Sequence, residues 1–111
     1  MALNYLDGKT LDDCDTDGHA LIVAGYGELR ADLLITDYED LRFLVIFANE
    51  YGRDLQSVFN RRGFDYLTCN CNISNETLRD FLNSKSEYLE LWGFIVRNEI
   101  SWIEISFPEK S

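Results

Sequence analysis

Aspartates recur at every second position in the stretch DDCDTDG, residues 12–18. Asp13, Asp15, Asp17 and Gly18 match the first half of a calcium-binding loop, in which carboxylates at positions one, three and five precede a glycine. Such a loop also needs a bidentate glutamate at position twelve, where this chain has Ala24. We therefore predict no metal site and no cofactor, although half a motif leaves calcium binding by this loop open.

The same loop has two other interpretations. Aspartate and glycine form turns because the short carboxylate accepts hydrogen bonds from nearby backbone. Alternatively the loop belongs to a binding surface. If residues 20–25 and 28–35 form a hairpin, the loop that precedes it lies near a helix that starts at residue 37. Seven carboxylates would then share one edge: Asp12, Asp13, Asp15, Asp17, Asp37, Glu39 and Asp40.

The overall charge indicates which partner such a surface would attract, although a solvated acidic face can also serve solubility alone. The chain has 20 acidic and 10 basic residues among its 111, a net charge of −10. Residues 1–50 hold eleven acids and three bases, a net of −8, so the acidity is concentrated in this half. Such a field repels nucleic acid and anionic membranes, and it attracts basic proteins.

Cysteine and histidine chemistry is poorly supported. Cys14, His19, Cys69 and Cys71 could be combined into a zinc site, but a C-x-C spacing is unfavourable for zinc. In a strand, Cys69 and Cys71 point to the same face, as two small buried side chains do. In a Cys14–His19 pair, the surrounding aspartates would raise the pKa of the thiol and so lower the fraction of reactive thiolate. His19 is better explained as a surface residue at a strand start. We find no catalytic constellation and predict that the protein is not an enzyme.

The expected fold is α+β, a mainly antiparallel sheet with one long helix and one short helix packed on it, in a single domain over residues 1–111. Hydrophobic residues make up 46% of the chain, enough for a core. The expected elements are a hairpin at 3–11 with the turn Asp7-Gly8, a strand at 19–25, a turn at Gly25-Tyr26-Gly27, a returning strand at 28–37, a strand at 64–73, and a short helix at 74–84 capped by Ser74 or Asn75.

The long helix is expected over residues 37–61. Apolar residues recur there at spacings of three and four: Leu41, Leu44, Val45, Ala48, Tyr51, Leu55, Val58 and Phe59. Thr36 and Glu39 form a capping box at the start, and Arg61-Arg62-Gly63 provides cations and a glycine at the end. Gly52 weakens the middle. The competing interpretation makes 41–48 a strand and starts the helix near Glu50.

The C-terminal stretch 86–107 predicts two strands that turn at Asn98-Glu99. Ile103, Ile105 and Phe107 share one face of the last strand, and Trp102 lies on the other with Ile100. This hairpin is covered on both sides, or it presents an aromatic patch and a free edge to a partner.

Cytoplasmic localisation is expected. The first ten residues contain neither a basic start nor an apolar run, so no secretory leader is predicted. The longest apolar run, residues 43–48, is too short to span a bilayer. Three cysteines, an odd number, favour reduced thiols.

Size and charge together indicate a small acidic binding protein that neutralises a basic partner. The concrete hypothesis is an immunity protein or antitoxin that blocks a toxin nuclease, because nuclease clefts carry cations for phosphate. Tyr26 and Tyr38 are the aromatic residues expected to add binding energy near the charges. A phage-type inhibitor of a host defence nuclease has the same physical profile. An assembly subunit that pairs through the C-terminal hairpin is the alternative from a different class.

Overall fold

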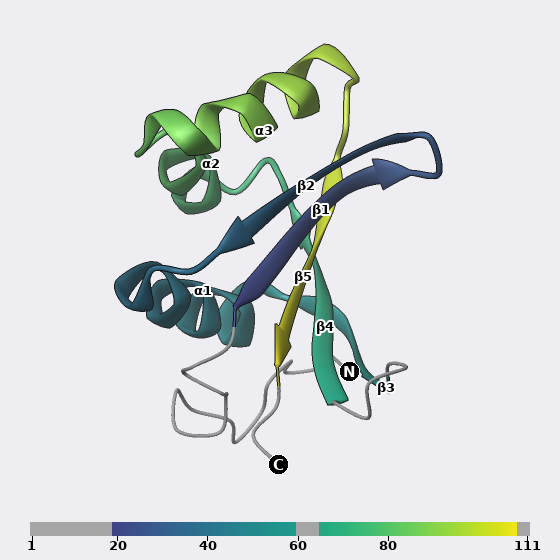
Figure 1. Ribbon diagram of the computed structural model, residues 1–111, viewed down its shortest axis with the longest axis vertical. Coiled ribbons are helices and arrows are strands. Elements are labelled where there is room, and N and C mark those ends of the chain that lie inside the picture. Colours follow the sequence, from purple (N-terminus) through teal and green to yellow (C-terminus); the bar gives the residue numbers. More distant parts are fainter. Residues whose placement is uncertain (1–18, 60–64, 109–111) are drawn as a thin grey trace.

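The computed structural model describes residues 19–59 and 65–108, which form an α+β fold (Figure 1). The expected fold class is confirmed, and the hairpin expected at 3–11 lies outside the described residues. In chain order the elements are β1 (Ala20–Tyr26), β2 (Leu29–Ile35), α1 (Tyr38–Tyr51), β3 (Arg53–Phe59), β4 (Asp65–Asn72), α2 (Glu76–Leu82), α3 (Ser86–Arg97) and β5 (Trp102–Pro108). The strands form one sheet in the order β2-β1-β5-β4-β3, and each neighbouring pair is antiparallel.

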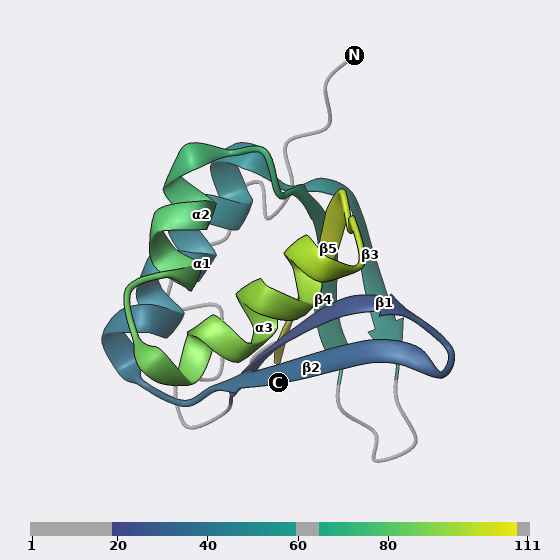
Figure 2. The same cartoon turned by 90° about the horizontal axis from the view of Figure 1, so that it is seen from above.

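All three described helices pack on the same face of this sheet, which curves around them (Figure 2). Along β1 and β5, buried residues that face the helices alternate with more exposed residues, as in a sheet covered on one face. Ile103, Ile105 and Phe107 of β5 are buried, as the alternation predicts, and so are Cys69 and Cys71 of β4. No described element covers the opposite face, where Trp102 and Glu104 are exposed.

The hairpin of β1 and β2 is confirmed, but its turn lies at Gly27-Glu28 and not at Gly25-Tyr26-Gly27, because Gly25 and Tyr26 belong to β1. Tyr26 pairs with Leu29, so Gly27 and Glu28 form a two-residue turn. Gly27 has φ +56°, as the first central residue of a type II′ turn requires. Gly25 has φ +87°, and a Cβ at this position would lie 2.1 Å from the Leu29 carbonyl oxygen. The strand can therefore turn toward its partner here only because Gly25 has no side chain.

Helix α1 starts one residue later than the capping box implied. Asp37, not Thr36, is the N-cap: its Oδ1 accepts a hydrogen bond of 3.0 Å from the backbone N–H of Asp40. An aspartate satisfies the open N–H groups of the first turn and also faces the positive end of the helix dipole. The expected capping box is therefore wrong by one position.

The expected helix end near residue 61 is wrong, because α1 stops at Tyr51. Gly52 adopts an extended conformation with ψ 152° and packs against β4. A Cβ on Gly52 would lie 2.5 Å from the Ala48 carbonyl oxygen and 3.0 Å from the Cys69 Sγ. Arg53 then donates from Nη1 to the carbonyls of Tyr51 (3.2 Å) and Gly52 (3.0 Å). This side chain serves the helix end in the way expected of Arg61-Arg62, which lie outside the described residues.

The apolar periodicity continued past the helix because the next segment is a strand. Residues 53–59 form β3 and pair with β4 instead of extending α1. The competing interpretation, a strand at 41–48 with a helix from Glu50, is also wrong, since those residues form the middle of α1. The short helix is confirmed as α2: its N-cap is Asn75, whose side chain accepts hydrogen bonds from the N–H groups of Thr77 and Leu78.

The hairpin expected over residues 86–107 is wrong in its first half, and only its second strand is present. Residues 86–97 form helix α3 instead of a strand, with Tyr88, Leu91 and Ile95 buried at spacings of three and four. The expected turn at Asn98-Glu99 is the C-terminal cap of this helix. Glu99 has φ +54°, and the Ile100 N–H reaches back to the Ile95 carbonyl at 3.0 Å, the bond of a Schellman motif.

Strand β5 therefore has different neighbours from those expected. It is the central strand, paired with β1 on one side and β4 on the other. A free edge along residues 100–107 was the basis of the assembly-subunit alternative. That edge does not exist, because both sides of β5 are already hydrogen-bonded.

Two glycine substitutions test this packing. Gly52→Ala is expected to lower the free energy of unfolding by about 1–3 kcal/mol, since its new methyl would collide with Ala48 and Cys69. Gly93→Ala, in the middle of α3, places its new Cβ more than 4 Å from any atom outside the adjoining backbone of α3 and is expected to raise the free energy of unfolding by about 1 kcal/mol. Urea denaturation measures both. Equal effects of the two substitutions would contradict the close approach of Gly52 to β4.

Candidate functional site

Four carboxylates lie where helices α1 and α3 begin: Asp37, Glu39, Asp40 and Glu87. We call them the acidic corner. Asp37, Asp40 and Glu87 all act electrostatically on Lys85, which directly precedes α3. Two helix N-termini thus bring their acidic first turns to one region of the surface, an arrangement that the helix dipoles favour.

Asp40 is held by the protein itself. Its Oδ2 accepts hydrogen bonds from the Lys85 ammonium, at 2.6 Å, and from the hydroxyl of Tyr88. The Lys85 nitrogen also lies 5.4 Å from the centre of the Tyr88 ring, within the range of a cation–π contact. Only 17% of the Asp40 side chain is exposed. Asp40 therefore fastens α1 to α3, whereas Asp37, Tyr38 and Glu39 remain exposed.

The two donors on Asp40 hold their protons firmly. The hydrogen bond to Asp40 raises the pKa of Lys85, with further contributions from the charges of Asp40, Asp37 and Glu87. Burial raises the pKa of Tyr88 above its ordinary value, and the hydrogen bond to Asp40 adds to this. Both groups stay protonated at neutral pH, so the cluster is a structural clamp and does not act as an acid–base pair.

A column of packed aromatic rings begins at Tyr88 and extends to helices α2 and α1. Tyr88 packs on Phe81, with ring centres 5.2 Å apart, and Phe81 stacks on Phe43 at 5.0 Å. The column continues along α1 through Phe47, at 6.1 Å, to Tyr51, at 5.1 Å. Because each ring belongs to α1, α2 or α3, the column fixes the three helices against each other and so fixes the acidic corner.

The structure brings together only part of the predicted site. Ala20 pairs with Ile35, so the start of β1 does lie beside the end of β2, just before Asp37. Tyr26 lies at the other end of this hairpin, about 20 Å away at the usual rise of a strand. It is 89% exposed and takes no part in the acidic corner. Asp12, Asp13, Asp15 and Asp17 lie outside the described residues.

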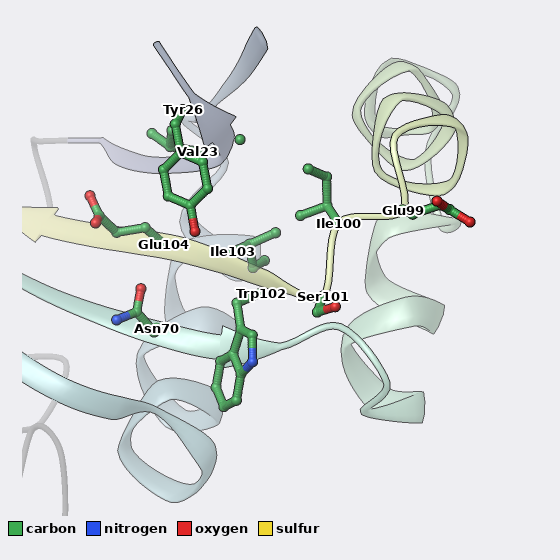
Figure 3. Close-up of a pocket in the computed structure, with 10 residues that line it drawn as sticks. Val23, Tyr26, Asn70, Glu99, Ile100, Ser101, Trp102, Ile103 and Glu104 are labelled. Carbon is green, nitrogen blue, oxygen red and sulfur yellow. The ribbon is translucent and has the colours of Figure 1, made fainter.

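A hollow on the open face of the sheet was missed from the sequence. It has a volume of about 340 Å³ and lies between the tip of the β1–β2 hairpin and the start of β5. Figure 3 shows Tyr26 and Glu104 on one side of β5, with Trp102 extending over the end of β4. The outward position of Trp102 could be predicted from the alternation in β5, but its place at the same hollow as Tyr26 depends on the pairing of β1 with β5.

The remaining candidate residues show no reactive arrangement. Cys69 and Cys71 are buried, as expected for two core thiols. A hydrogen bond with Cys69, followed by burial, raises the pKa of Cys71, which makes its thiol a poor nucleophile. His19 is exposed at the start of β1, as predicted. Within residues 19–59 and 65–108, no three potential metal ligands lie together.

Comparison of the chain with protein-family models, with curated proteins and with solved structures gives no match. In the described part of the chain, no helix combines the length and hydrophobicity of a membrane-spanning segment.

The clamp on Asp40 predicts a loss of stability in alkaline solution. In the unfolded chain Tyr88 loses its proton near its ordinary pKa of 10.0, whereas the folded protein retains it to higher pH. Above pH 10 the unfolded state thus binds fewer protons than the folded state, and stability falls as pH rises. Lys85 acts in the same direction above 10.5.

Tyr88→Phe is expected to cost about 1 kcal/mol of stability at pH 7, because Asp40 loses one donor. It should also reduce the decline above pH 10. Tyr26→Phe is the matched control, since Tyr26 is exposed, and should change stability by less than about 0.5 kcal/mol. Urea denaturation from pH 7 to 11 under reducing conditions gives both quantities. The same alkaline decline in the wild-type protein and in Tyr88→Phe would refute the role of Tyr88.

Proposed function

We propose that this protein is a cytoplasmic, acidic binding protein that neutralises a basic partner, and specifically an immunity protein or antitoxin that occupies the nucleic-acid cleft of a toxin nuclease. The observation that carries the proposal is the exposed turn Asp37-Tyr38-Glu39 at the start of α1, with Glu87 at the neighbouring start of α3. The first turn of α1 thus carries two exposed side-chain carboxylates and one exposed aromatic ring.

Among the described residues, Asp37, Glu39 and Glu87 form no ion pair with a base. The Lys85 ammonium is bound to Asp40, and the exposed Arg42, three residues after Glu39 on α1, forms no ion pair with that glutamate. Asp37 keeps one carboxylate oxygen for the helix cap, while Glu39 has no such role. An uncompensated cluster of carboxylates attracts a cationic surface over distance and raises the association rate.

Tyr38 supplies the contact that charges alone lack. It is 49% exposed, although it is a large aromatic residue. Aromatic side chains at the centre of an interface contribute much of its binding energy, and surrounding charges mainly set orientation and rate. Tyr38 between Asp37 and Glu39 has the composition of such a centre.

Rigidity is the third supporting feature. Asp40 ties the first turn of α1 to α3, and the aromatic column holds both helices against α2. A surface that is already ordered loses little conformational entropy on binding. Carboxylates held in fixed positions can take the places of phosphates in a cleft whose cations are spaced for nucleic acid.

The test begins with the genes that flank the gene of this chain. Each flanking product, or its C-terminal domain, is expressed in a bacterial host alone and together with this protein, and viable cells are counted. We expect one product to stop growth and this protein to restore it. If no flanking product is toxic or forms a complex with this protein, the immunity function is refuted.

The acidic corner is then tested in the purified complex. Asp37→Asn with Glu39→Gln removes two charges and keeps an acceptor at the helix cap, and it should slow association about tenfold at low salt. The control pair is Glu50→Gln with Glu76→Gln. It changes the net charge equally, but at the end of α1 and the start of α2, and should alter the rate less than about twofold. Equal effects of the two pairs would mean that only total charge matters.

A further inference from the structure

The hollow on the open face of the sheet combines aromatic and acidic groups. Tyr26 and Trp102 provide rings, Glu104 a carboxylate and Asn70 an amide, around a base that includes Val23. The lining contains no basic residue. In Figure 3 the Tyr26 ring descends over β5 between Glu104 and Ile100, whereas the Glu99 carboxylate points away. Glu104 is therefore the carboxylate on the same side of β5 as the Tyr26 ring, and its side chain extends along β5 away from Ile100.

Neighbouring strands place these groups in register. Glu104 of β5 pairs with Val23 of β1 on one side and Asn70 of β4 on the other. Trp102 lies two residues before Glu104 on the same face of β5, next to Asn72 of β4. The floor of the hollow is thus the three-stranded centre of the sheet, a rigid support for the side chains that rise from it.

Arg30, the arginine whose pKa Glu104 affects, does not form an ion pair with Glu104. Arg30 of β2 forms two hydrogen bonds with Asp32, at 3.0 and 3.2 Å. Glu104 contributes only a more distant charge effect, which helps to raise the pKa of Arg30. Within the described residues, Glu104 forms no ion pair and accepts no hydrogen bond from another side chain.

We propose that this hollow binds an arginine side chain presented by a partner protein. The guanidinium group would stack on the Tyr26 ring and pair with the Glu104 carboxylate, while the Asn70 carbonyl accepts a further N–H. The indole of Trp102, which extends over the end of β4, would border the hollow on the other side of β5. The proposal rests on the proposed function in one respect, that the arginine belongs to the basic partner.

Arginine fits this combination better than lysine. A guanidinium is planar, stacks on aromatic faces and has several N–H donors for a carboxylate and an amide at once. An ammonium is a strongly hydrated point charge that uses a ring face less well. The hollow also lies at the opposite end of the β1–β2 hairpin from the acidic corner, so it is a second contact point and not part of the first.

The test is a nuclear magnetic resonance titration of the full ¹⁵N-labelled chain with N-acetyl-L-arginine amide at constant ionic strength. N-acetyl-L-citrulline amide, a neutral molecule of nearly the same shape, is the matched probe. We expect saturable shifts of the Trp102 indole and of the Asn70 and Glu104 amides with the arginine probe. The Trp92 indole is the internal control, because Trp92 is not part of the lining.

Variants assign the binding to particular groups. Glu104→Gln and Tyr26→Ser should each lower the affinity for the arginine probe by about fivefold or more. Both positions are exposed, so folding should be retained. Glu90→Gln, an equal charge change on the exposed side of α3, should leave the affinity within about twofold.

Three results would overturn the arginine site: no saturable shift, equal binding of the citrulline probe, or shifts confined to Asp37 and Glu39. The last result would still agree with the proposed function, because the acidic corner would have bound the cation. Conversely, the arginine probe could bind in the hollow while no flanking product is toxic or binds this protein. That result would support the arginine site and refute the immunity function.

Discussion

The fold depends on the last strand. Strand β5 is the link between two hairpins, since it pairs with β1 on one side and with β4 on the other, and the hairpins do not pair with each other. Its buried residues Ile103, Ile105 and Phe107 then form the middle of the core under the helices. Each buried side chain of this size contributes about 2 kcal/mol, so the strand supplies both hydrogen bonds and a substantial share of the burial.

This arrangement determines where the protein can meet other molecules. The helices cover one face of the sheet and leave the other open, and the hairpin of β1 and β2 runs from the acidic corner at one end to the Tyr26 hollow at the other (Figures 1 and 2). The two surfaces differ in construction. Helix N-termini gather the carboxylates of the acidic corner, whereas strand pairing assembles the hollow around Glu104.

Acidic residues in this chain have separate roles that charge counting cannot distinguish. Asp37 caps a helix, Asp32 holds Arg30, and Asp40 joins α1 to α3 through Lys85 and Tyr88. Glu39 and Glu104 have no such partner among the described side chains. A free carboxylate beside an exposed aromatic ring is a better indication of a contact surface than net charge, because its desolvation can be repaid only by an added cation.

Local sequence by itself determined the elements whose signals need no distant partner. These are the glycine turn of the first hairpin, the Asn75 cap of α2, the alternation along β5, and the burial of Cys69 and Cys71. Tertiary structure decided the rest. Helix α1 stops at Tyr51, because Gly52 is extended where β4 approaches too closely for a side chain. Residues 86–97 are helical although they are rich in strand-forming residues, because their buried stripe packs on the core. Asp40 is bound by Lys85, 45 residues away, and Tyr26 and Glu104 line one hollow only because β1 pairs with β5. Turns and caps are fixed by a few neighbouring residues, whereas helix ends, strand order and shared pockets are fixed by contacts between segments far apart in the chain.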